Sequence, residues 1–216
     1  MPTRVGRPAV GAVLALAGIL AGCPSTTLYR TADPVPRGRW QLAFGASGGA
    51  LADDVQEARS PTGQGEVGLR RGVSGNADVG VKLFTLGLGV DATLRFVHRG
   101  RWSLAFAPEV SAMHTPTSTL TTAASHLFAR GSVLATYRTS PQWAFTLAPS
   151  VGAGLYLPRS AGYRAGLWLG ATVNAEVRVG AGVWLVPEVG GYRVLTGEVP
   201  LRGAGFSVGL GLRWAL

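Results

Sequence analysis

The sequence predicts an all-β protein whose strands form a closed antiparallel barrel across a membrane, with ten strands or alternatively eight. Three observations support this prediction. From residue 40 onward, apolar side chains recur at every second position in successive short segments. Short and long connections largely alternate between these segments, and aromatic residues recur near one end of the predicted strands. With 32 glycines and only 14% charged residues, the composition suits strands that pack closely inside a small barrel.

The alternating segments are nine to seventeen residues long, and most have nine to fourteen residues. This length allows a tilted strand to cross a bilayer. They span approximately 40–51, 64–73, 76–84, 86–98, 102–113, 126–137, 143–156, 163–179, 182–192 and 204–216. The last is the most regular, since Phe206, Val208, Leu210, Leu212, Trp214 and Leu216 occupy every second position. Three prolines at similar places in their strands, Pro108, Pro149 and Pro187, predict shared β-bulges.

The connections indicate which strand ends lie together. Long loops are predicted at 52–63, 114–125 and 193–203, and short turns join most of the other strands. Membrane barrels have short turns on one side and longer loops on the other, with an even number of strands. Both chain ends then lie on the side of the short turns.

Aromatic residues distinguish the outer face from an apolar core. Trp40, Trp102 and Trp143 begin strands that run one way, and Tyr137 and Trp214 end strands that run the other way. All five occupy the alternate positions that carry the apolar residues, which we call the apolar parity. They fall at one rim, which is typical of the aromatic girdle of a membrane barrel. The core of a soluble sandwich has no reason to place its aromatic residues at one end of every strand.

The opposite parity carries charged residues, which we expect to face the lumen. Six acidic and six basic side chains are predicted to pair across a narrow interior, because a buried charge without a partner is costly. They are Glu66, Asp78, Asp91, Glu109, Glu176 and Glu188 with Arg70, Lys82, Arg95, Arg130, Arg178 and Arg213. This interpretation predicts a mostly closed lumen, and a selective narrow pore is the alternative.

The first 39 residues carry targeting signals. Arg4 and Arg7 precede an apolar run over 9–21 that is too short to span a bilayer as a helix, so residues 1–22 are predicted to be a cleaved signal peptide. Its end, Leu20-Ala21-Gly22-Cys23, resembles the lipobox of bacterial lipoproteins, which implies that Cys23 is lipidated. Residues 23–39 are expected to be a lipidated flexible linker, or alternatively to fold into the lumen, and 40–216 to form the barrel.

The last residues carry a second resemblance. Gly211-x-x-Trp214-x-Leu216 is similar to the C-terminal insertion signal of bacterial outer-membrane barrels, although Gly209 stands where that signal usually has a polar residue. The whole chain resembles small outer-membrane β-barrel lipoproteins of Gram-negative bacteria. The resemblance implies an outer-membrane location with the N-terminus lipid-anchored on the periplasmic side. It also implies that outer-membrane lipid and the barrel-assembly and lipoprotein-sorting machineries are partners. It does not imply a substrate.

Other functional classes are not favoured. The net charge of +9 is spread along the strands, so nucleic-acid binding is not expected. The histidines His98, His114 and His126 form no close pair that suggests a metal site, and Ser125 points away from its neighbour His126 in a strand. We therefore expect no enzyme, metal or cofactor. The leading hypothesis is a structural or interaction protein, with a narrow porin-like channel and a soluble periplasmic β-sandwich lipoprotein as alternatives; the oligomeric state is open.

Overall fold

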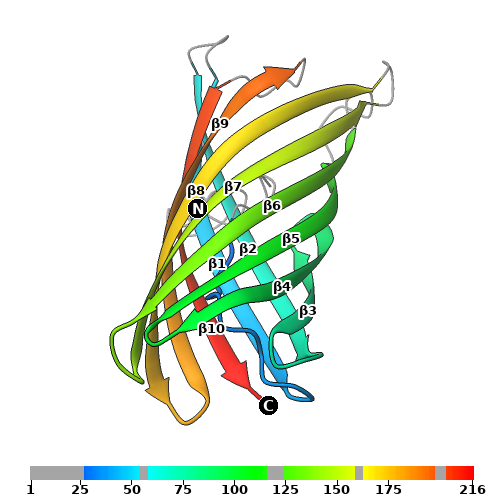
Figure 1. The fold of residues 1–216 in the computed structure, drawn as a ribbon. Helices are drawn as coiled ribbons and strands as arrows, with labels where there is room; N and C mark the ends of the chain where they lie inside the picture. The colour runs from blue at the N-terminus through cyan, green and yellow to red at the C-terminus, as the bar shows by residue number, and fades with distance from the viewer. Residues whose placement is uncertain (1–26, 54–57, 116–123, 159–162, 198–202) are drawn as a thin grey trace, which may run out of the picture.

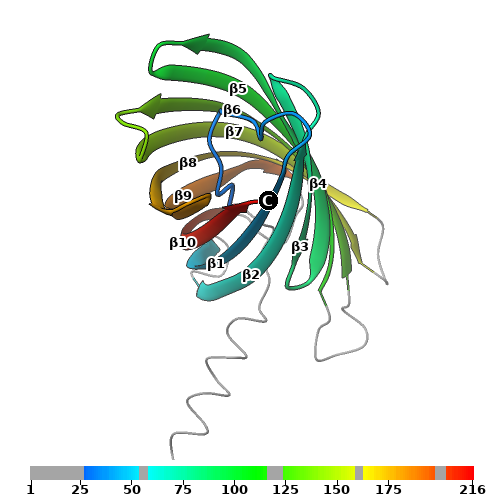
Figure 2. The ribbon, with the colours of Figure 1, turned by 90° about the horizontal axis from the view of Figure 1, so that it is seen from below.

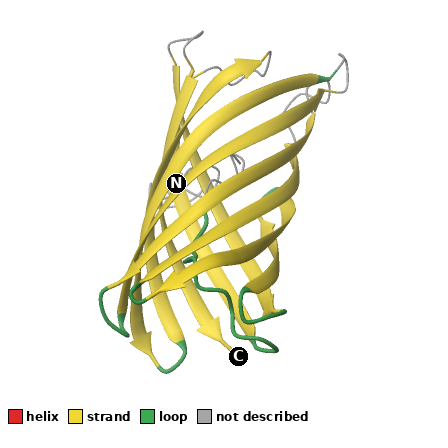
Figure 3. Cartoon of the chain, in the orientation of Figure 1, coloured by secondary structure: helices red, strands yellow, loops and turns green. Residues whose placement is uncertain are grey.

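The computed structural model describes residues 27–53, 58–115, 124–158, 163–197 and 203–216, and they form one closed β-barrel (Figures 1 and 3). Its strands are β1 (Trp40–Asp53), β2 (Ala58–Gly72), β3 (Ala77–Phe84), β4 (Gly87–Arg99), β5 (Trp102–Thr115), β6 (Ala124–Arg138), β7 (Trp143–Pro158), β8 (Arg164–Gly180), β9 (Val183–Gly197) and β10 (Gly203–Ala215). No helix among the described residues is long and apolar enough to span a membrane.

Every strand pairs antiparallel with its chain neighbour, and β1 pairs with β10 to close the sheet. The register of that closure runs from Gln41 opposite Ala215 to Asp53 opposite Gly203. The prediction of a closed ten-stranded barrel is confirmed, and the alternative of eight strands is wrong. A sandwich is also excluded, because a single sheet closes on itself where a sandwich needs two.

The two ends of the barrel differ. The turn end, at the bottom of Figure 1, carries the short turns after β2, β4, β6 and β8 together with the C-terminus. The loop end carries the connections after β1, β3, β5, β7 and β9. Strands reach further into the loop end than predicted: most of 52–63 belongs to β1 and β2, and the strands around 114–125 and 193–203 also extend into the predicted loops.

The two faces of the sheet follow the predicted parity. On β10, the side chains of Phe206, Val208, Leu210, Leu212 and Trp214 point outward and are 40 to 58% exposed. The tryptophans Trp40, Trp102 and Trp143 are also exposed, and each begins a strand at the turn end. Trp102 packs beside Tyr137, with 4.8 Å between their ring centroids. The barrel therefore presents an apolar outer face with aromatic residues at one rim.

The three strand prolines do not form bulges. Near Pro108, Pro149 and Pro187 the pairing with the preceding strand is interrupted, but it resumes on both sides in the same register. Proline lacks the N–H that a ladder needs. Two residue pairs are missing from each ladder, but neither strand carries an extra residue there. The register shifts lie elsewhere, in β4 between Arg95 and Val97 and within the β8–β9 pair.

Candidate functional site

The lumen is filled from the turn end by residues 27–39, which we call the lumenal segment. Figure 2 shows this segment, in blue, passing inside the ring of strands. Its residues from Thr27 to Ala32 are all buried, and Val35 is buried as well. Of the two alternatives for 23–39, folding into the lumen is therefore correct for the described part, and a flexible linker is wrong; residues 23–26 lie outside the described residues.

Glu188 of β9 holds the backbone of the lumenal segment. The amides of Leu28 and Tyr29 each donate to one carboxylate oxygen of Glu188, both at 2.8 Å. Tyr29 has a φ of 43°, in the left-handed region that non-glycine residues rarely adopt. Such a conformation persists only where its surroundings enforce it. The paired acceptors of Glu188 and the hydrogen bond from the Tyr29 hydroxyl to the carbonyl of Ala46 at 2.8 Å supply that enforcement.

Glycines in the wall make room for the ring of Tyr29. A Cβ atom on Gly45, Gly209 or Gly211 would lie 2.2 to 2.7 Å from the Tyr29 side chain, closer than real contacts allow. These three glycines come from the neighbouring strands β1 and β10 and face the lumen. The ring thus occupies a recess that only residues without a side chain can form. Burial raises the pKa of the Tyr29 hydroxyl above its ordinary value, so it stays a neutral donor.

Asp33 attaches the lumenal segment to the wall at the turn end. It accepts a hydrogen bond from Ser103 at 2.6 Å and forms ion pairs with Arg138 at 3.0 Å and Arg95 at 3.3 Å. Burial alone would raise the pKa of the Asp33 carboxyl, but these bonds and charges outweigh it and hold that pKa below its ordinary value. The bulge in β4 changes the parity after Arg95, which brings His98 within 3.0 Å of the Ser103 hydroxyl.

The wall itself carries a connected set of ion pairs beside the lumenal segment. Arg70 bridges Asp78 and Asp91, and Glu109 is shared by Lys82, at 2.8 Å, and Arg130. Asp91 also binds Arg30 of the lumenal segment at 2.9 Å, and Asp78 accepts the amide of Val35 at 2.7 Å. A third cluster joins Glu176 to Arg213 and, at 3.3 Å, to Arg138. The wall charges and the lumenal segment therefore form one network.

The predicted charges meet across strands and not along them. The sequence places Asp91 four residues before Arg95, and Asp78 four residues before Lys82, but the structure forms neither pair. Residues four apart on a strand are about 13 Å apart, whereas cross-strand neighbours lie about 5 Å apart. Glu109 and Arg130 are direct cross-strand partners on β5 and β6, and they do pair.

Three of the twelve predicted charges form hydrogen bonds to uncharged groups. Glu188 forms no ion pair within the described part of the chain and binds backbone amides, as above. Arg178 lies exposed at the turn end and donates from Nε to the carbonyl of Gly180 at 3.3 Å. Glu66 accepts hydrogen bonds from Thr27 and Gln64 at 2.9 and 3.3 Å.

Sequence reasoning missed three members of the network. Arg30 and Asp33 stand in a segment without strand periodicity, so parity could not assign them a face. Arg138 ends β6, one residue beyond the predicted segment 126–137, and it lies on the same inward-facing alternate positions as Arg130, eight residues earlier. That continuation was the available signal.

The other predicted site residues are placed as follows. Trp214 and Leu216 are about half exposed on the outer side of the turn end, whereas Gly211 faces the lumen against Tyr29. Cys23 lies outside the described residues. Ser125 meets His114, not His126, with 3.3 Å between its hydroxyl and Nδ1 on the outer face. Within the described part of the chain, no three His, Cys, Asp or Glu residues converge as metal ligands.

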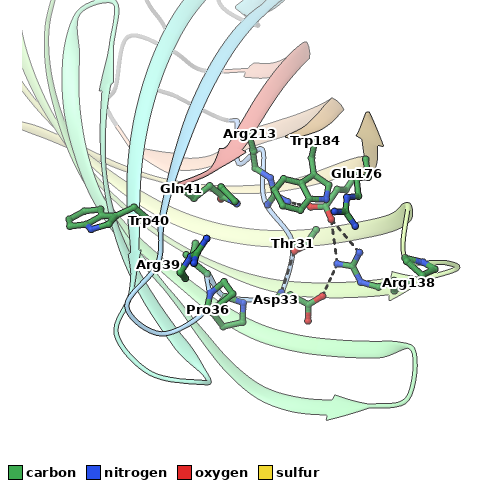
Figure 4. Close-up of a pocket in the computed structure, with 15 residues that line it drawn as sticks. Thr31, Asp33, Pro36, Arg39, Trp40, Gln41, Arg138, Glu176, Trp184 and Arg213 are labelled. Carbon is green, nitrogen blue, oxygen red and sulfur yellow. Dashed lines mark hydrogen bonds and ion pairs between the residues drawn. The ribbon is translucent and has the colours of Figure 1, made fainter. Parts of the chain in front are cut away.

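A cavity of about 580 Å³ opens at the turn end below the lumenal segment (Figure 4). Its wall includes Asp33 on one side and Glu176, Trp184 and Arg213 on the other, with Arg138 forming ion pairs to both carboxylates. The cavity therefore opens at the turn end of the barrel, and the lumenal segment forms its inner wall.

No protein-family model matches this chain, and no curated protein matches it either. Among solved structures it is similar to the Neisserial surface protein A (TM-score 0.47, 12% identity, covering 82% of this chain and 96% of that one). It is also similar to the attachment invasion locus protein Ail of Yersinia pestis (0.43, 10%, 83% and 99%). A third is an outer membrane channel from Pseudomonas putida F1 (0.48, 10%, 90% and 100%). These likenesses are too loose to assign a role.

Proposed function

We propose that this protein is an outer-membrane β-barrel whose lumen is closed by its own lumenal segment, and that it has a structural or interaction role. The apolar outer face supports the membrane location. Side chains that are 40 to 60% exposed, such as Leu88, Val151 and Phe206, recur on β4, β7 and β10. A continuous apolar surface of this kind is unfavourable in water and suits contact with lipid.

The observation that carries the closed lumen is the packing of the lumenal segment. Ala32 has no exposed surface, and it packs in one cluster with Leu28 of the same segment and Ala105, Leu134 and Ala148 of the wall. Its amide donates to the hydroxyl of Thr136 at 2.8 Å. The segment is thus bonded to the wall through both its side chains and its backbone.

Two measurements test this proposal. A membrane-embedded barrel should resist extraction by carbonate and urea and should change its gel mobility when heated in detergent. In planar bilayers, the reconstituted full-length protein should show no steady conductance. Release by carbonate would contradict the membrane location, and stable single-channel steps from the wild type would contradict the closed lumen.

A gated narrow channel is the second candidate. It is favoured by the fact that the closing element is attached by separate hydrogen bonds and ion pairs, such as those of Glu188 and Asp33, and is not a strand of the wall. Glu188→Ala removes both backbone acceptors, so this hypothesis predicts intermittent conductance in the variant. Leu210→Val on the outer face is the matched control and should stay closed. A closed Glu188→Ala protein would count against gating.

Lipidation of Cys23 is a separate proposal. The proposal rests on the resemblance of Leu20-Ala21-Gly22-Cys23 to the lipobox of bacterial lipoproteins. Metabolic labelling with a fatty-acid analogue should mark the wild type and not Cys23→Ser. A wild type that stays unlabelled would contradict lipidation.

A further inference from the structure

The turn-end cavity has more basic than acidic groups. Four arginines line it, against the two carboxylates of Asp33 and Glu176. Each carboxylate already binds two guanidinium groups, Asp33 those of Arg95 and Arg138, and Glu176 those of Arg138 and Arg213. The acids of the cavity are therefore occupied.

The remaining basic groups are available to a ligand. Among the described residues, neither Arg39 nor Arg178 forms an ion pair, and both are exposed at the cavity mouth. Deeper in the cavity, the side chain of Arg213 is only 8% exposed, and its Nε atom has no hydrogen-bond partner in the described part of the chain. A buried guanidinium donor without an acceptor is unfavourable, and a bound anion would relieve that cost.

Apart from Thr31 and Gln41, the uncharged part of the lining is apolar or aromatic. The ring of Trp184 lies beside Arg213, with 5.8 Å from the guanidinium carbon to the ring centroid. Pro34, Val35 and Pro36 of the lumenal segment also line the cavity. Figure 4 shows Trp184 and Arg213 together, across the cavity from Pro36 and Arg39. The volume of about 580 Å³ lies in the range of small-molecule sites, which are mostly apolar with a few placed polar groups.

We propose that the turn-end cavity binds a small carboxylate that carries an aromatic or apolar body. The guanidinium groups of Arg39, Arg178 and Arg213 receive the carboxylate, and Trp184 packs against the body. Arginine suits this role because its planar donors match the two oxygens of a carboxylate. The site rests on the docked lumenal segment, which forms one of its walls, but it assigns a ligand that the closed lumen does not require.

Titration calorimetry of the detergent-solubilised full-length protein with sodium benzoate tests this proposal. We expect saturable binding that Arg39→Gln/Arg178→Gln weakens by about tenfold or more. The matched control is Arg99→Gln/Arg101→Gln, which removes the same charge from the same rim outside the cavity, and it should bind like the wild type. Trp184→Leu should weaken benzoate more than acetate, because only benzoate has a ring to contact.

The preparation is first shown to be closed in bilayer recordings, so that a failure to bind benzoate counts against the site and not against the closed lumen. Equal loss of affinity in both double variants would show that binding follows overall charge, and would overturn the proposal. Tighter binding of inorganic phosphate than of benzoate would overturn the assignment of ligand class.

Discussion

The two halves of the lumen are filled in different ways. In the turn-end half, the lumen is filled by the lumenal segment, which is not part of any strand. Glu188 binds its backbone, and its Asp33 and Arg30 form ion pairs with the wall. In the loop-end half, the lumen is filled by strand side chains. Trp168 and Tyr192 pack edge to face with 6.1 Å between ring centroids. A Cβ on Gly152 or Gly205 would lie 2.2 or 2.6 Å from these two rings.

Both halves place aromatic rings against glycines of the wall, but only the turn-end half depends on a segment that is not part of a strand. Rings that belong to the strands cannot leave without unfolding the wall. The ring of Tyr29 can leave if its segment undocks. We therefore expect substitutions near the turn end to affect closure, and substitutions near the loop end to leave it intact.

Arg70→Met should have the largest effect. It removes the partner shared by Asp78 and Asp91, the two carboxylates that also hold Val35 and Arg30 of the lumenal segment. Breaking a buried ion pair on one side costs about 3–5 kcal/mol in the free energy of unfolding. Urea unfolding of the reconstituted barrel measures the change. The control Arg178→Met, at an exposed position, should change it by less than about 0.5 kcal/mol.

Gly45→Ala tests the recess for Tyr29. The new methyl group would lie 2.2 Å from the ring, so either the ring or the strand must move. Overpacking of this kind costs about 1–3 kcal/mol. The control is Gly68→Ala on the inner face of β2, where the new contacts start at 3.7 Å and are ordinary. If both variants unfold at the wild-type urea concentration, Tyr29 does not occupy the recess.

A smaller effect is expected from pH. The folded pKa of Asp33 is depressed, so its contribution is complete above the unfolded value of about 4 and is lost as pH falls through the folded value. Docking at the turn end should therefore weaken only in acid. Asp33→Asn should flatten this acid limb in a series of thermal unfolding curves. An unchanged limb in the variant would show that other carboxylates determine it.

Trp168→Ala should have the smallest effect on closure. It opens the loop-end half, but the lumenal segment still fills the turn-end half. Planar-bilayer recordings should show no steady conductance in this variant. Steady conductance would mean that the loop-end rings, and not the lumenal segment, close the barrel.

Much of the fold was predictable because strand alternation and turn spacing act locally. The strand number and the two faces follow from period two, and the rim position of Trp102 and Trp143 follows from the spacing of the turns. The charge pairs were only partly predictable, since parity assigns a face but register assigns partners: Glu109 and Arg130 meet because β5 and β6 align them. The bulge after Arg95 reversed the parity of His98, and no residue pattern indicated it.

The lumenal segment was not predictable from period, because it has none. Pro34, Pro36 and Gly38 indicate an irregular chain. The same pattern is found in flexible linkers and in segments that are held in place by their surroundings. What distinguishes the two is the set of acceptors and glycine recesses in distant strands, such as Glu188 and Gly209. Those partners are about 160 residues or more away in the chain.

The central claim, that residues 27–39 close the folded barrel, is tested most directly by the accessibility of cysteine. In a Cys23→Ser background, Ala32→Cys places a thiol where the wild-type side chain has no exposed surface, and Arg37→Cys places one at an exposed position of the same segment. Reaction with a bulky, membrane-impermeant maleimide is followed in the folded barrel and after heating. We expect the Cys at 37 to react at once and the Cys at 32 to react only after unfolding. Equally fast reaction of both thiols in the folded barrel would show that the lumenal segment does not close it.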